Sequence, residues 1–151
     1  MTPAGPDLCA LYPTSRSVED LAEPFRGCVS AFLLALRARG ATVRISATRR
    51  PRERALLMRV AWDVAHGLVE PEEAPETPVP VSWTREGARS MVAAYKLVHR
   101  PSLSSRHITG TAIDMTISGW PGTEAELHAM GALHGVRKLV SDPPHWSIDG
   151  R

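Results

Sequence analysis

Three side chains able to bind a metal ion lie in two short segments near the C-terminal end of the sequence. His107 and Asp114 are seven positions apart with Gly110 between them, and His145 follows about thirty residues later in the segment Asp142-Pro143-Pro144-His145-Trp146. A glycine turn can direct a loop histidine and a strand aspartate toward one point. The double proline restricts the separation between a carboxylate and the second imidazole. We therefore expect the three side chains to form one site.

Two imidazoles and one carboxylate favour a catalytic zinc site, because they leave the fourth tetrahedral position of Zn²⁺ to water. With six histidines and only two cysteines in the chain, a metal site would use histidine and carboxylate ligands. Bound zinc lowers the pKa of water to about 7, and a nearby carboxylate such as Asp142 can accept its proton. Spacing alone leaves open that these histidines are ordinary surface or core residues.

Hydrophobic periodicity predicts the elements that would position this site. The predicted helices span about 24–39, 51–64, 84–99 and 123–133, and the predicted strands 42–46, 111–117, 136–140 and 145–148. Helices come mainly early and strands mainly late, which favours an α+β fold. We expect a small antiparallel sheet that carries the site and packs against about four helices. Residues 1–23, rich in proline at their start, are predicted to be a surface arm, and residues 24–151 a single domain.

Two sequence motifs and one further segment resemble a known family. The pattern S-x-H-x-x-G-x-A-x-D is matched by Ser105, His107, Gly110, Ala112 and Asp114. It is typical of the zinc D-alanyl-D-alanine carboxypeptidases and L-alanyl-D-glutamate endopeptidases, peptidoglycan peptidases with the hedgehog-type metallopeptidase fold that include phage endolysins. Residues 142–146 resemble the family's second motif, an acid three residues before a histidine. Residues 46–51 resemble its upstream arginine-containing segment, so the resemblance spans roughly residues 24–149.

The resemblance implies a set of metal ligands and a general base. One Zn²⁺ per chain would be bound by His107, Asp114 and His145. Asp142 would be the general base. The family's base is usually glutamate, and the shorter aspartate could place its carboxylate about 1.5 Å short of the water, enough to lower activity by orders of magnitude.

Further residues are implied in substrate binding. Arg49 would stabilise the oxyanion at the scissile carbonyl by charge-assisted hydrogen bonds. Arg50 is its nearest competitor, and Arg49 is also one of eight arginines between positions 37 and 59 that could simply face solvent. Ser105 would support the site or contact substrate, and Trp146 would form a pocket wall or part of the core.

These assignments predict a zinc metallopeptidase that hydrolyses an amide bond in peptidoglycan stem peptides, as a D,D-carboxypeptidase or an L-Ala-D-Glu endopeptidase. The aspartate at position 142 leaves open a zinc-binding pseudo-peptidase without hydrolytic activity, as in the related hedgehog domains. A more distant alternative is an arginine-rich nucleic-acid-binding module. It lacks a recognised motif and the aromatic residues expected among the arginines, so we expect no nucleic-acid partner.

Composition limits the cellular setting. The longest strongly apolar run, residues 31–36, is far shorter than the roughly 20 residues of a membrane span, and no signal peptide is visible. We expect a monomer made in the cytoplasm that reaches the cell wall after lysis, through a holin or by specialised secretion. Its partner there would be the peptidoglycan peptide substrate.

Overall fold

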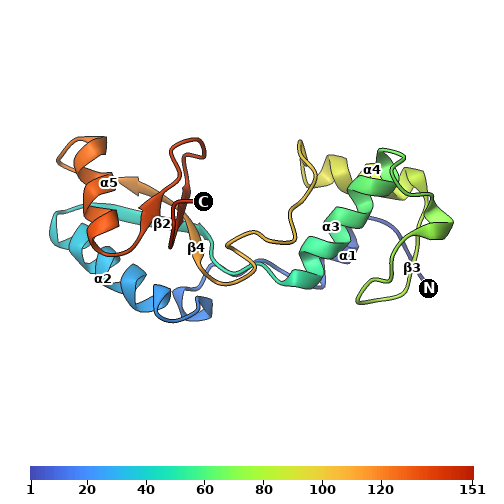
Figure 1. Cartoon of the computed structure of the whole chain (residues 1–151), viewed down its shortest axis with the longest axis horizontal. Helices are drawn as coiled ribbons and strands as arrows, with labels where there is room; N and C mark the ends of the chain where they lie inside the picture. The colour runs from blue at the N-terminus through green and yellow to red at the C-terminus, as the bar shows by residue number, and fades with distance from the viewer. The chain divides into compact units, whose positions relative to one another are not determined.

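The computed structural model describes residues 1–151, and two parts of the chain each pack around a core of their own (Figure 1). Residues 1–13 and 51–104 form one part, called here the helical unit. Residues 14–50 and 105–151 form the other, the sheet unit. This division differs from the predicted arm over residues 1–23 and single domain over residues 24–151. The chain divides in this way because residues 51–104 bury apolar side chains together with those of the N-terminal segment.

The helical unit is built on α3 (Arg52–Ala65) and α4 (Arg85–Ala94). Its smaller elements are β1 (Thr2–Pro3), α1 (Asp7–Ala10), the 3₁₀ helix η2 (Pro71–Glu73) and β3 (Val81–Ser82), with β1 and β3 parallel. Leu8 and Cys9 of the predicted arm are buried in one core cluster with Leu57 and Met91. The segment before residue 14 is therefore part of a core.

The first turn of α4 agrees with its prediction, but its end does not. Thr84 accepts a hydrogen bond from the Gly87 amide, as expected of a helix N-cap. The helix ends at Ala94, about five residues before the predicted end, because Lys96 adopts φ 51°. A left-handed residue interrupts the repeating helical hydrogen bonds.

The sheet unit contains a four-stranded antiparallel sheet with the strand order β2-β4-β6-β5. Its elements are η1 (Val18–Asp20), α2 (Phe25–Ala38), β2 (Thr42–Ala47), β4 (Ala112–Ser118), α5 (Glu124–Leu133), β5 (Arg137–Lys138) and β6 (His145–Ser147). The predicted α+β class and antiparallel sheet are confirmed. Of the four predicted helices, two belong to this unit and two to the helical unit. No helix of the chain is both long and apolar enough to cross a membrane.

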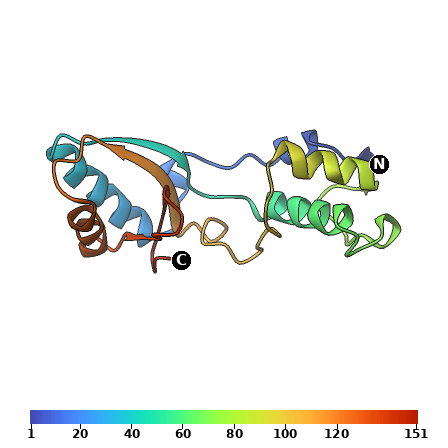
Figure 2. The same cartoon turned by 90° about the horizontal axis from the view of Figure 1, so that it is seen from above.

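Alternation along β4 separates the core of the sheet unit from its opposite face. Ile113 pairs with Trp146, and both are buried in the cluster that includes Phe32 of α2. Figure 2 shows α2 running along this face of the sheet. Asp114 pairs with His145 one position further along. Because successive strand residues point to opposite faces, Asp114 and His145 lie on the face away from α2.

Replacing Gly131 of α5 with alanine is expected to destabilise the sheet unit by about 1–3 kcal/mol, as overpacking of a dense core does. An ideal Cβ at this position would lie 2.5 Å from the Val136 carbonyl oxygen and 2.6 Å from the Trp146 ring. Urea unfolding followed by circular dichroism measures the loss. Gly27→Ala in α2 is the matched control, because its nearest contact would be a flexible Glu23 oxygen at 3.4 Å. Equal stability of the two variants would contradict the expectation.

Candidate metal centre

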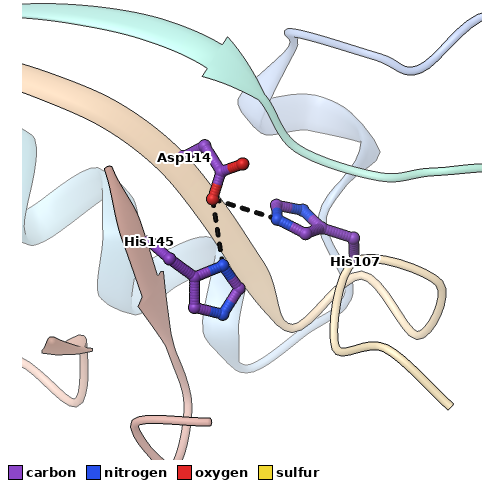
Figure 3. A group of neighbouring side chains, drawn as sticks. All are labelled: His107, Asp114 and His145. Carbon is purple, nitrogen blue, oxygen red and sulfur yellow. Dashed lines mark hydrogen bonds and ion pairs between the residues drawn. The ribbon is translucent and has the colours of Figure 1, made fainter. Parts of the chain in front are cut away.

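The three predicted ligands come from a loop and two neighbouring strands of the sheet unit (Figure 3). His107 lies in the loop before β4, Asp114 in β4, and His145 at the start of β6. Gly110 makes the turn between the first two with φ 73°, and its carbonyl accepts a hydrogen bond from Ala22. A Cβ there would lie 2.9 Å from the Ala22 nitrogen, so the turn requires glycine both for its conformation and for its space.

One carboxylate oxygen joins the two imidazoles. Asp114 Oδ1 lies 3.0 Å from His107 Nε2 and 3.0 Å from His145 Nδ1, as Figure 3 shows. One ligand atom from each residue lies within 4.8 Å of the other two, so the group could hold a metal ion. The histidine side chains are 5% and 9% exposed, and that of Asp114 is 22% exposed. The structure thus brings the three predicted ligands together, with both imidazoles largely buried.

In each imidazole one ring nitrogen, the inner one, faces Asp114, and the other, the outer one, contacts a main-chain oxygen. His107 Nδ1 lies 2.6 Å from the Thr48 oxygen, and His145 Nε2 lies 2.8 Å from the Arg151 oxygen. A carbonyl only accepts hydrogen bonds, so both outer nitrogens carry hydrogen. In a neutral imidazole the inner nitrogen then directs a lone pair at the anionic Asp114 oxygen. This arrangement needs a cation, either protons on the rings or a metal ion, and it fits the donor set that zinc prefers.

The pKa shifts of Asp114 and His145 also indicate that this group favours a cation between its ligand atoms. Burial raises the pKa of the Asp114 carboxyl, but hydrogen bonds with His107 and His145 outweigh burial and hold its pKa well below the ordinary value. The hydrogen bond with Asp114 raises the pKa of His145, against the opposing effect of burial. A proton and a metal ion therefore compete for the same inner nitrogen.

The segment after β2 runs beside His107. Thr48 is fully buried, and its carbonyl holds the His107 ring. The Arg50 amide donates a hydrogen bond of 3.0 Å to the His107 carbonyl. Arg49, the predicted oxyanion residue, stands between Thr48 and Arg50 in the chain, and its side chain is exposed. Sequence reasoning missed the roles of Thr48 and Arg151, because a main-chain oxygen has no residue-type signature.

Asp142 lies in the loop between β5 and β6, outside the group of three converging ligand atoms. Its side chain is exposed, and its main-chain oxygen accepts a hydrogen bond from the His145 amide at 3.0 Å. After the larger contribution of the Asp114 hydrogen bond, the Asp142 charge also raises the pKa of His145. The predicted base therefore acts electrostatically on one of the predicted ligands.

Ser105 and Trp146 occupy different surroundings. The Ser105 hydroxyl accepts a hydrogen bond from the His107 amide at 3.2 Å, so it supports the backbone of that histidine. Trp146 is 2% exposed and packs 5.4 Å from the Phe32 ring, measured between centroids. It also borders a hollow of about 380 Å³ that includes Pro143 and Pro144. Trp146 is thus mainly a core residue with one edge at a surface depression.

A salt bridge outside the ligand group connects the loop of His107 to the segment after β6. The Arg106 guanidinium donates to Asp149 Oδ2 through Nη2 at 2.8 Å and through Nε at 3.1 Å. Asp149 Oδ1 accepts hydrogen bonds of 3.3 Å from the Ser147 hydroxyl and the Arg151 amide. The hydrogen bond from Arg106 lowers the pKa of Asp149 to about 2.

The contribution of Asp149 to stability is expected to disappear in acid. Its folded pKa of about 2 lies below the unfolded value of about 3.9, so the stabilisation is present above pH 4 and is lost as the pH falls through 2. Urea unfolding should find Asp149→Asn less stable than the wild type at pH 7 and similar to it near pH 2. Glu19→Gln, at an exposed acid of the same unit, should show no such convergence. A stability difference independent of pH would contradict this assignment.

Two solved structures are among those similar to this chain. No protein-family model matches the chain, and no curated protein matches it. One structure is a mutant of the vancomycin resistance D,D-pentapeptidase VanY from the VanB-type cassette in complex with Zn(II), with 18% identity, a TM-score of 0.46, and coverage of 93% of this chain and 83% of that one. The other is VanYB in complex with D-alanine-D-alanine, with 17% identity, a TM-score of 0.46, and coverage of 91% and 79%.

Proposed function

We propose that this chain is a zinc metallopeptidase of the D-alanyl-D-alanine carboxypeptidase and L-alanyl-D-glutamate endopeptidase family, acting on peptidoglycan stem peptides. The observation that carries the proposal is the convergence of His107, Asp114 and His145, with both outer imidazole nitrogens already bonded to main-chain oxygens. Zinc bound there would polarise the scissile carbonyl and lower the pKa of water. The sequence motif around His107 supports the same family.

Two residues would complete the reaction. Asp142 would accept a proton from water as it attacks the peptide carbonyl and would then deliver it to the leaving amine. Arg49 would donate hydrogen bonds to the carbonyl oxygen as negative charge develops there. Arg49 has an exposed side chain, and main-chain groups of its two neighbours in the chain, Thr48 and Arg50, contact His107, which supports this role.

Digestion of purified muropeptides tests the proposal. The zinc-loaded protein is incubated with stem peptides, and the products are identified by mass spectrometry. Loss of a terminal D-alanine would identify a carboxypeptidase, and cleavage between L-alanine and D-glutamate an endopeptidase. His107→Ala is the matched inactive control. If neither the wild type nor Asp142→Glu releases a product, the hydrolytic function is rejected.

A pseudo-peptidase is the second candidate, favoured by the exposed position of Asp142 outside the converging group. It would bind one zinc ion per chain and bind stem peptide without cleaving it. Calorimetric titration with intact peptide, followed by mass spectrometry of the same sample, separates the two functions. Binding with full recovery of intact peptide would favour the pseudo-peptidase.

A further inference from the structure

The loop that carries Asp142 closes around one ammonium group. Lys138 Nζ donates hydrogen bonds to the main-chain oxygens of Leu139 at 2.6 Å, Asp142 at 2.6 Å and His145 at 3.3 Å. A lysine ammonium has three donors, so these three acceptors use all of them. Lys138 therefore acts on the backbone of this loop and has no donor left for a substrate.

The ammonium is itself fixed in place. Lys138 lies on β5, which pairs with β6, and its Nζ stands 5.8 Å from the centroid of the buried Trp146 ring. Burial lowers the pKa of Lys138, while the negative charges of Asp142, Asp114 and Glu124 oppose that effect. The loop is thus tied to a cation that is anchored to the core of the sheet unit.

Two functional residues share this anchor. Asp142 holds its carboxylate on a single methylene, so the place of that carboxylate depends closely on the backbone at position 142. The His145 carbonyl binds the same ammonium, and the His145 amide donates to the Asp142 oxygen at 3.0 Å. Movement of residue 142 relative to the ligand histidine would break at least one of these bonds.

We propose that Lys138 is a positioning residue that sets the distance of the Asp142 carboxylate from the metal centre by holding the Asp142 and His145 carbonyls on one ammonium. The inference rests on the proposed peptidase function. A displacement of 1 Å in a reacting group can reduce a rate about 100-fold. Removing the ammonium should therefore slow catalysis while the three metal ligands stay in place.

Lys138→Met tests the inference, because methionine keeps an unbranched apolar chain and has no donor. In the metal-free protein, hydrogen exchange should accelerate at the Asp142 and His145 amides and stay unchanged in α2. In the zinc-loaded protein, kcat should fall about 10- to 100-fold, with KM and zinc content close to the wild type. Arg37→Met, at an exposed position of α2, removes the same charge and should change none of these values.

The effect of a Lys138 variant on kcat, compared with and without a change at Asp142, distinguishes a positioning role from a general loss of stability. Lys138→Arg, which keeps a cation and donors, should retain more of kcat than Lys138→Met. Asp142→Glu should change kcat by a different factor in the Lys138→Met background than in the wild type. In that background the loop backbone is no longer bonded to the ammonium, so the longer side chain starts from a different position. A purely structural role would give the same factor in both.

Several outcomes would overturn the inference. These are unchanged exchange at the two loop amides, a wild-type kcat in Lys138→Met, loss of zinc in proportion to kcat, or equal effects of Asp142→Glu in both backgrounds. Absence of product from the wild type in every peptide would instead be failure of the proposed peptidase function, and the inference would fall with it. An active wild type with an equally active Lys138→Met would overturn the inference alone.

Discussion

Asp114→Asn is expected to weaken zinc binding by more than about 100-fold, since loss of an outer partner of a ligand already costs about 10- to 100-fold. One oxygen of Asp114 lies 3.0 Å from both imidazoles, so the substitution removes the only anion that joins them within the group of three. An asparagine oxygen is neutral and a poorer zinc ligand. Elemental analysis and competition with a chelating dye measure the loss. His107→Ala and His145→Ala should likewise lose the metal.

An independent measurement applies to the metal-free protein. Because the Asp114 hydrogen bond is the main cause of the raised pKa of His145, Asp114→Asn should lower that pKa toward or below its ordinary value. Titration of the imidazole signals by NMR reports the shift directly. Thr116→Ala, at an exposed position of the same strand, is the control and should alter neither the pKa nor the zinc affinity. Wild-type zinc affinity in Asp114→Asn would place the metal elsewhere.

Asp142→Asn should lower kcat by about 100- to 10,000-fold, the usual contribution of a general acid–base group. Zinc content should stay at the wild-type value, because Asp142 lies outside the group of ligand atoms. The asparagine keeps the size of the side chain and removes its ability to accept a proton at neutral pH. Hydrolysis of a stem peptide, followed by chromatography, gives the rate.

The comparison with Asp142 needs an acid of the same unit that carries no role in the site. Glu19→Gln provides it, because Glu19 is exposed in η1 and the substitution removes one negative charge. Its kcat should equal that of the wild type. If Asp142→Asn also keeps the full kcat, another group accepts the proton and the assignment of Asp142 is wrong.

Local sequence patterns predicted most of the elements of the sheet unit. The 3.6-residue periodicity of α2 and the capping box of α5 depend on neighbours a few positions away, and both elements are present. The turn at Gly110 and the strand after it are also local features, so the sequence indicated that His107 and Asp114 could meet. Their meeting with His145 required more, because it depends on pairing of β4 with β6 in a register that sets Asp114 opposite His145.

The division into two units was outside the reach of local patterns. The predicted arm carries prolines at positions 3, 6 and 13, which favoured an extended surface segment, and only the packing of Leu8 and Cys9 with Leu57 and Met91 shows that it completes a core. Contacts between residues about fifty positions or more apart have no periodic signal in the sequence. The helices themselves were predicted, but their assignment to different cores was decided by tertiary structure.

The sequence by itself determined which side chains could bind a metal and which local elements would carry them. Tertiary structure decided the setting of those side chains: the Thr48 and Arg151 oxygens that hold the outer nitrogens, and the Lys138 ammonium that holds the loop of Asp142. The physical reason is that each of these contacts ends on a main-chain oxygen. Every residue carries one, so residue type gives no indication of which oxygen folding will bring to the site.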